Sequence, residues 1–322
     1  MNSLFQKTSS HWVKYSEYQC REKDGALYVM PAPKAKPVIT DPLEDADTMV
    51  VNALNVGLLM MNRSKDTVIR EALMDFVLKY GLLGFMTALP TTPRFLDYES
   101  AYLLKNHFIR VESMTVEDYT SLFFPFDQPD MLLTENGVQW DISGDRDMMA
   151  LAMTMSDKPM ALNLCFQREY AERYDWLLTQ FKDLAFTFMS SYLFYEDYDS
   201  LDEDTRNLYR QGMAAFGGIA PTYHIALLDK PTIVWDFHSL LLGIQMMLSF
   251  MITDETKPLR VCKHCGKAFV AERLNAVFCS PRCKNQYNVY KSRGKRNSKR
   301  AALLPPQRMW YNRVNRKSVH CG

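Results

Sequence analysis

The sequence lacks the short motifs by which many enzymes are identified. It contains no glycine-rich phosphate-binding loop, no serine nucleophile elbow and no His-Glu-x-x-His pair. Four of its six histidines lie in the first 256 residues, and spacing gives none of them a recognisable catalytic partner. An enzyme therefore has no motif in its support and is the weakest of our hypotheses.

The sequence also lacks a segment suited to crossing a membrane or directing secretion. A bilayer needs about 20 apolar residues, and the longest uncharged apolar run, residues 239–252, is too short and predicts a buried helix. The first residues lack the basic start and apolar run of a signal peptide. Three of the seven cysteines, Cys20, Cys165 and Cys321, are scattered, which fits a reducing compartment. We therefore expect a cytoplasmic protein that does not associate with membranes.

The first 256 residues do contain hydrophobic periodicity. Hydrophobic residues make up 47% of the 322 positions, enough for a large core. Helical spacing of apolar residues predicts helices over residues 45–62, 64–79, 145–154, 164–195, 202–215 and 237–252. Strands are predicted over residues 26–30, 137–142, 221–228 and 232–235. The predicted fold class is α+β, with a mostly helical body over residues 1–256, a zinc finger over residues 257–300 and a tail over residues 301–322.

The remaining four cysteines are clustered in two pairs near the C-terminus. Cys262 and Cys265 form the first pair, and Cys279 and Cys283 follow after thirteen residues. Two closely spaced pairs match a tetrahedral thiolate site, so we expect one structural Zn²⁺ held by these four residues. The alternatives are four free thiols at accidental spacing, or disulfides, which the missing secretion signal disfavours.

The residues around the cysteines predict how such a site is built. Gly266 suits the positive φ angle that follows a zinc knuckle. Residues 267–270 and 277–278 are expected to form two strands of a hairpin, and Ser280 followed by Pro281 predicts the start of a helix. Knuckle, hairpin and a helix bearing the last two ligands make a treble-clef finger. His264, inside the first pair, is expected to be a surface residue rather than a ligand.

Charge is divided unevenly along the chain. Residues 257–322 contain 17 Lys or Arg and one acidic residue, Glu272, whereas residues 1–256 contain 21 basic and 36 acidic residues. The net charge of +1 is therefore the sum of a basic C-terminal segment, residues 257–322, and an acidic body, residues 1–256. Such a segment predicts binding to a polyanion; the alternative is that it docks on the acidic body.

A family resemblance adds to this reading. The runs Leu259-Arg-Val-Cys-Lys-His-Cys265 and Phe278-Cys-Ser-Pro-Arg-Cys-Lys-Asn285, with Phe269 between them, resemble the CGNR zinc-finger family. Where that family has Cys-Gly-Asn-Arg at the last ligand, this chain has Cys-Lys-Asn-Gln, so the Gly and the Arg differ. The resemblance covers roughly residues 235–300. It implies a bacterial regulator of transcription that binds nucleic acid, with a body that senses a ligand or mediates oligomerisation.

Basic and amide residues on the helix that bears Cys283 and in the basic segment that follows it are the candidate contacts to nucleic acid, because such side chains bind phosphates and base edges. They are Arg282, Lys284, Asn285, Asn288, Lys291, Arg293, Lys295, Arg296, Lys299 and Arg300. A helix break is expected at Gly294. DNA is favoured over RNA through the resemblance alone. The alternatives are a zinc-stabilised protein-interaction module and an enzyme with an accessory finger.

Overall fold

In the computed structural model, the protein is described over residues 8–9, 12–84, 101–102, 113–114, 122–126, 168–214, 222–237, 239–273 and 275–297. The helices are η2 (Pro42–Asp45), α1 (Ala46–Met61), α2 (Asp66–Tyr80), α6 (Tyr174–Glu196), η4 (Tyr198–Ser200), α7 (Glu203–Ala214), α8 (Leu240–Thr253) and α9 (Pro281–Asn297). The strands are β1 (Thr8–Ser9), β2 (Trp12–Tyr15), β3 (Tyr18–Lys23), β4 (Ala26–Pro31), β5 (Pro37–Thr40), β6 (Ala101–Tyr102), β7 (Ser113–Met114), β8 (Glu172–Arg173), β9 (Thr222–Leu227), β10 (Pro231–Asp236), β11 (Leu259–Val261) and β12 (Ala268–Val270). The fold is α+β, as predicted. The predicted strand over 137–142, the helix over 145–154 and the tail lie outside the described residues.

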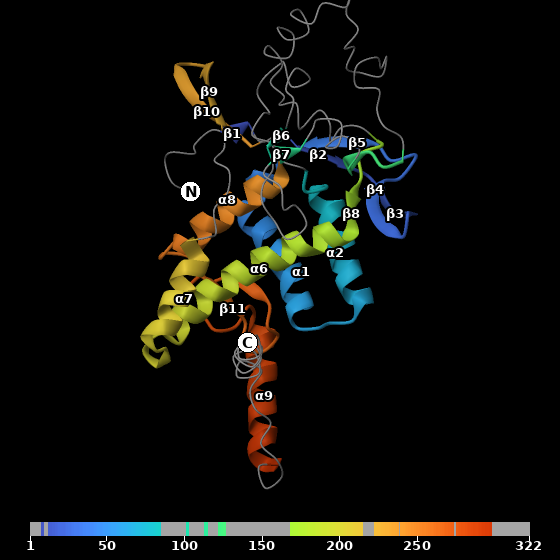
Figure 1. Ribbon diagram of the computed structural model, residues 1–322. Coiled ribbons are helices and arrows are strands. Elements are labelled where there is room, and N and C mark those ends of the chain that lie inside the picture. Colours follow the sequence, from blue (N-terminus) through green and yellow to red (C-terminus); the bar gives the residue numbers. More distant parts are fainter. Residues whose placement is uncertain are drawn as a thin grey trace, which may run out of the picture.

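Helix α1 lies at the centre of the helical core and packs on α2, α6 and α8 (Figure 1). Each of these helices directs apolar side chains inward, among them Leu54, Phe76, Phe181 and Ile244, all nearly or fully buried. The helices predicted over residues 45–62, 64–79, 202–215 and 237–252 are confirmed as α1, α2, α7 and α8. Their amphipathic or wholly apolar patterns were sufficient to locate them. Helices α1, α2 and α8 each bury a face in this core, whereas α7 packs on α6 and none of its described side chains is buried.

Helices α1 and α6 approach each other closely at Gly57 of α1. An added Cβ at this position would lie 2.1 Å from the carbonyl oxygen of Phe181 and 2.6 Å from the Cβ of Ala185, both on α6. No side chain fits in that space, so the backbones of α1 and α6 meet directly here. Gly57 therefore determines how closely the two central helices pack.

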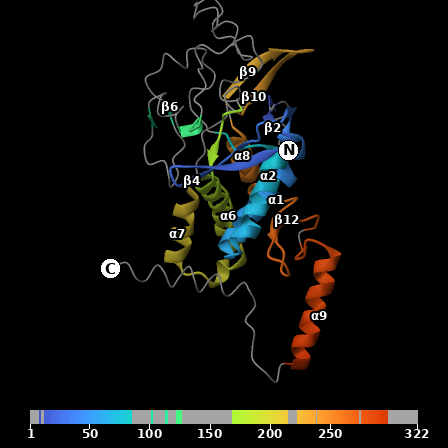
Figure 2. The same ribbon diagram turned by 90° about the vertical axis from the view of Figure 1, so that its right-hand side faces the viewer.

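Small sheets cover one end of the helices (Figures 1 and 2). Strands β2 and β5 pair, β4 lies between β3 and β8, β6 pairs with β7, and β10 lies between β1 and β9. The predicted strands over residues 26–30, 221–228 and 232–235 are confirmed as β4, β9 and β10. The β9–β10 hairpin extends away from the helices.

The predicted helix over residues 164–195 is wrong at its start. Residues 168–171 are not helical, residues 172–173 form β8 against β4, and α6 begins only at Tyr174; residues 164–167 lie outside the described part. Asp175 accepts a hydrogen bond from the backbone N–H of Trp176 (2.8 Å) within the first turn of α6. Glu172 remains in an extended conformation because its side chain is bound elsewhere in the core.

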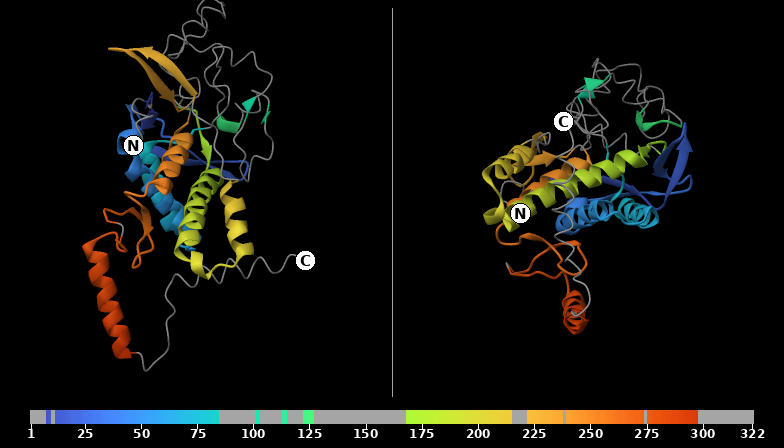
Figure 3. Two further views of the ribbon diagram at one scale, coloured as in Figure 1. Left: turned by 90° about the vertical axis from the view of Figure 1, so that its left-hand side faces the viewer. Right: turned by 60° about the horizontal axis from the view of Figure 1, so that its bottom comes forward.

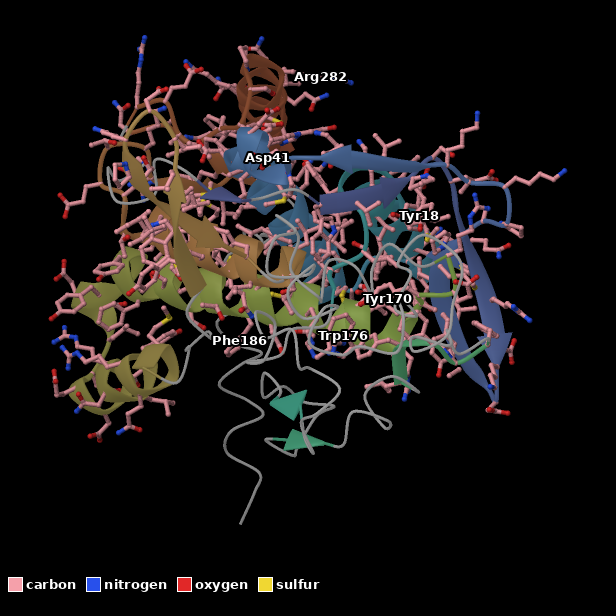
Figure 4. The ribbon with its side chains drawn as sticks, turned by 90° about the horizontal axis from the view of Figure 1, so that it is seen from above. Tyr18, Asp41, Tyr170, Trp176, Phe186 and Arg282 are labelled. Carbon is pink, nitrogen blue, oxygen red and sulfur yellow. The ribbon has the colours of Figure 1, made fainter. Side chains whose placement is uncertain are left out.

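The Glu172 carboxylate is fully buried and accepts three hydrogen bonds. The backbone N–H groups of Leu83 and Gly84 donate to it at 3.0 and 2.5 Å. The Tyr170 hydroxyl donates at 2.8 Å, and Tyr170 lies close to Trp176 at the start of α6 (Figure 4). Burial raises the pKa of Glu172 to about 7, outweighing the lowering effect of these hydrogen bonds.

This burial predicts a pH-dependent stability. The pKa of Glu172 is about 7 in the folded chain, against an ordinary value of 4.5 for a glutamate side chain. The stabilising contribution of the protonated form is therefore complete below pH 4.5 and is lost as pH rises through 7. The difference is about 3 kcal/mol. We expect Glu172→Gln to remove this part of the pH dependence in urea unfolding at pH 5 and pH 8.

The exposed carboxylate Glu22 on β3 provides the control. Glu22→Gln should leave the difference in unfolding free energy between pH 5 and pH 8 at the wild-type value. An unchanged pH dependence in Glu172→Gln would contradict the role assigned to the buried carboxyl.

The cysteine-bearing segment is attached to the body by its own strands. The side chain of Asn55 on α1 accepts a hydrogen bond from the backbone N–H of Ala268 (2.8 Å) and donates one to its carbonyl oxygen (3.3 Å). Leu259 and Ala268 are buried in the same hydrophobic core as α1. The core therefore continues past residue 257, and β11–β12 lies against the helices while α9 points away from them (Figure 3).

Candidate metal centre

The four clustered cysteines come together in space. Their sulfur atoms all lie within 4.8 Å of one another. Cys279 Sγ is 3.7 Å from Cys265 Sγ and 3.6 Å from Cys283 Sγ, and none of the four is in a disulfide. Among the described residues this is the one group of three or more His, Cys, Asp or Glu side chains arranged to hold a metal ion.

The first cysteine pair lies in the tight connection between β11 and β12. The backbone N–H of Cys262 donates to the carbonyl oxygen of Lys267 (2.8 Å), and that of Gly266 donates to Cys262 (2.9 Å). Gly266 has a φ of +72°, so the positive φ expected at this position is confirmed. These bonds direct both sulfur atoms of the pair to one side.

The predicted hairpin between residues 267–270 and 277–278 is wrong. Strand β12 pairs with β11, and residues 277–278 do not form a strand. Instead, the carbonyl oxygen of Val277 accepts a hydrogen bond from the N–H of Lys263 in the first cysteine pair (2.9 Å). This bond holds the second pair beside the first. Strand β11 was missed because it has only three residues and no extended alternation.

The second pair lies at the start of α9, as Ser280 and Pro281 predicted. Ser280 Oγ accepts a hydrogen bond from the N–H of Cys283 (3.2 Å), and the Ser280 carbonyl accepts one from Lys284 (3.1 Å). Cys279 therefore precedes the helix and Cys283 lies in its first turn. Both residues therefore lie beside the positive end of the helix dipole. The expected break at Gly294 is wrong, since α9 continues to Asn297.

The sulfur environments differ. Cys262 is 1% exposed. Burial raises its pKa, but hydrogen bonds from the backbone of Cys265, Cys279 and His264 outweigh this and lower the pKa to about 7. Burial raises the pKa of Cys265, and Cys262 raises it further against the lowering effect of hydrogen bonds from the Lys267 backbone and from Cys279. Burial also raises the pKa of Cys279, and the three neighbouring thiols raise it further. Neighbouring thiolates repel each other because they have the same charge. A bound cation would offset this repulsion and stabilise the thiolates together.

A contact that the sequence did not indicate joins the first cysteine pair to α9. His264 Nε2 and Gln286 Oε1 are 3.0 Å apart, and the His264 ring stacks on Tyr290 with 5.8 Å between centroids. One turn away, Tyr287 packs on Phe278 at 5.2 Å. Gln286 and Tyr290 are four residues apart and therefore share one helix face. This spacing is the sequence feature from which the contact could have been predicted.

The candidate nucleic-acid contacts that the structure describes are on the surface of α9. Arg282, Lys284, Asn285, Asn288 and Lys291 are all exposed, and Figure 4 shows Arg282 at the edge of the molecule. The backbone of α9 also includes Arg293, Lys295 and Arg296, whereas Lys299 and Arg300 lie outside the described residues.

Comparison with known proteins gave no relative. No protein-family model, no curated protein and no solved structure matches this chain. Within the described ranges, no helix combines the length and the apolar composition required to cross a membrane.

Proposed function

We propose that this protein binds nucleic acid through a zinc-stabilised C-terminal finger and acts in gene regulation, with DNA as the target. The supporting observation is the placement of α9. Of the four clustered cysteines, Cys279 directly precedes this helix and Cys283 lies in its first turn, and the helix extends away from the rest of the described structure (Figures 1 and 3). Long basic and amide side chains are exposed along it.

Zinc is the metal that fits the donor set best. Four sulfur ligands and no other side chain in the group match a closed, structural zinc site. A tetrahedron with Zn–S bonds of about 2.3 Å has sulfur atoms about 3.8 Å apart. The sulfur separations of 3.6 and 3.7 Å are close to this value. The first cysteine pair lies in the turn of the β11–β12 hairpin and the second pair lies at the start of α9, and this arrangement supports the proposal of a zinc-stabilised finger.

The geometry of α9 supports insertion beside a duplex. At about 1.5 Å per residue its 17 residues extend about 25 Å. Gln286, Tyr287 and Tyr290 occupy the side facing the finger. Lys284, Asn288 and Lys291 lie on the other side, on average roughly 120° away at 100° per residue. A helix fits the major groove of about 12 Å width, where Lys and Asn contact phosphates and base edges.

Two other functions remain as competing hypotheses. A protein-interaction finger predicts weak, unselective binding to nucleic acid and a defined protein partner. An enzyme with an accessory finger predicts clustered titratable groups in a polar pocket of the body. The choice of DNA and the bacterial origin rest on the resemblance to the CGNR family, which no family model supports here.

The decisive experiment measures binding of the zinc-loaded protein to duplex DNA, single strands and structured RNA over a salt series. Charge reversal on α9 is preferable to deleting residues 257–322, because Leu259 and Ala268 belong to the core. We expect Lys284→Glu with Lys291→Glu to weaken binding and to reduce the slope of log K against log[salt] by about 2.

Lys34→Glu with Lys182→Glu is the matched control, since both lysines are exposed on the body away from α9. This control should retain the wild-type salt slope. Absence of binding to all three nucleic acids at low salt would refute the proposal and favour a protein partner.

A further inference from the structure

The β9–β10 hairpin presents one wholly apolar face. In its antiparallel register Tyr223 is opposite Trp235, Ile225 is opposite Ile233 and Leu227 is opposite Pro231. Successive residues of a strand point to opposite faces, so these three directly paired couples share one face. The Tyr223 and Trp235 rings also contact each other, with centroids 5.5 Å apart.

Most of this face is open to solvent, although Trp235, at the end of β10 away from the turn, is half-buried and packs against the core. Tyr223 is 63% exposed, Ile225 65%, Leu227 83% and Ile233 52%, and Leu228 beside the turn is 51% exposed. By contrast, Ala226, Thr232 and Val234 on the opposite face are half-buried. The open side chains amount to roughly 500 Å² of apolar surface, comparable to the largest patch that a monomer usually exposes. Contiguous surface of this kind marks an interaction site.

The charges of the hairpin indicate the partner. The side chains of this face, Tyr223, Ile225, Leu227, Pro231, Ile233 and Trp235, include no Asp, Glu, Lys, Arg or His, so the face suits an equally uncharged surface. The turn has one residue of each sign, Asp229 and Lys230, both exposed. A surface with an apolar strip and a paired plus and minus charge at its tip is complementary to itself. We propose that two copies of this chain associate face to face through the β9–β10 hairpin.

A two-fold axis along the hairpins brings the complementary groups together. Rotation by 180° about that axis places β9 of one copy over β10 of the other, as an isologous interface requires. Asp229 of each copy then faces Lys230 of the other, and the two apolar strips cover each other. The area per copy is below the roughly 800 Å² of a standard interface, so the dimer dissociates at about micromolar concentration.

The position of the hairpin leaves the finger free. In Figures 1, 2 and 3 the hairpin and α9 lie at opposite ends of the described structure. Self-association therefore leaves both basic helices uncovered and does not depend on the proposed function. If that function also holds, the dimer offers two fingers and favours a target with two-fold symmetry.

Sedimentation equilibrium of the full-length, zinc-loaded protein without nucleic acid tests the dimer. We expect a monomer–dimer equilibrium in the wild type. In Ile225→Lys, which places charge in the centre of the apolar strip, the dissociation constant of the dimer should rise at least 100-fold. Leu208→Lys is the matched control, because Leu208 is 68% exposed on α7, outside the hairpin. It should dimerise as the wild type does.

Charge reversal at the turn tests the orientation. Asp229→Lys places two lysines opposite each other and should weaken the dimer about fivefold to tenfold, while Asp229→Lys combined with Lys230→Asp should restore it. Thermal melting and metal content check that each variant is folded. A wild type that stays monomeric at ~100 µM, or a dimer unaffected by Ile225→Lys, would overturn the proposal. Nucleic-acid binding is measured separately, so either idea can fail without the other.

Discussion

Replacing Cys283 with serine is expected to release the metal and unfold the segment around α9. Cys283 is one of four sulfur atoms within 4.8 Å of one another, and a structural zinc site needs all four. Zinc contributes about 10–16 kcal/mol to the folding of isolated finger peptides, so loss of the proposed zinc is expected to exceed any other local contribution. Metal content should fall from one ion per chain to near zero. The helical circular dichroism signal should decrease by about the fraction of the helical residues that belong to α9.

The contacts that remain without metal are too weak to hold α9. The hydrogen bond between His264 and Gln286 contributes about 1 kcal/mol. The stacking of His264 on Tyr290 adds about 1 kcal/mol, and Tyr290 is 60% exposed. Strands β11 and β12, in contrast, should persist because Asn55 and the buried Leu259 attach them to α1. The body is therefore expected to unfold at nearly the wild-type denaturant concentration.

Cys20→Ser is the matched control for the metal site. Cys20 is a half-buried free thiol on β3, 3.8 Å from the sulfur of Met74 and far along the chain from the cluster. This variant should keep one metal per chain. Metal content that does not change in Cys283→Ser would contradict the ligand assignment.

Among substitutions that add a single methyl group to the body, Gly57→Ala is expected to cause the largest loss of stability. The new Cβ would lie 2.1 Å from the carbonyl oxygen of Phe181 and 2.8 Å from its carbonyl carbon, which are backbone atoms and cannot rotate away. Helices α1 and α6 must separate, and overpacking of this kind costs about 3 kcal/mol or more. Urea unfolding should show a lower midpoint.

Gly212→Ala separates this clash from helix propensity. Gly212 lies on α7, and a Cβ there meets nothing within 4 Å. Alanine favours a helix over glycine by about 1 kcal/mol, so this variant should be slightly more stable than the wild type. If both glycine variants gained stability, the close packing of α1 on α6 would be refuted.

Much of the secondary structure was predictable because it depends on neighbouring residues. Helices α1, α2, α7 and α8 followed from apolar residues three and four positions apart, and β4, β9 and β10 from their composition and turns. The failures involve distant partners. Glu172 is extended rather than helical because it binds the backbone of Leu83 and Gly84, which are 89 and 88 residues away.

The sequence by itself determined the four cysteines as a group, the start of α9 at Ser280 and Pro281, and the separation of charge between body and tail. Each depends on residues within about 20 positions or on simple counting. Only the tertiary structure decided that Gly57 sits against α6, that Asn55 pairs with Ala268, and that the β9–β10 hairpin leaves its apolar face open. These features join elements far apart in sequence, and spacing along one chain does not specify which surfaces pack together.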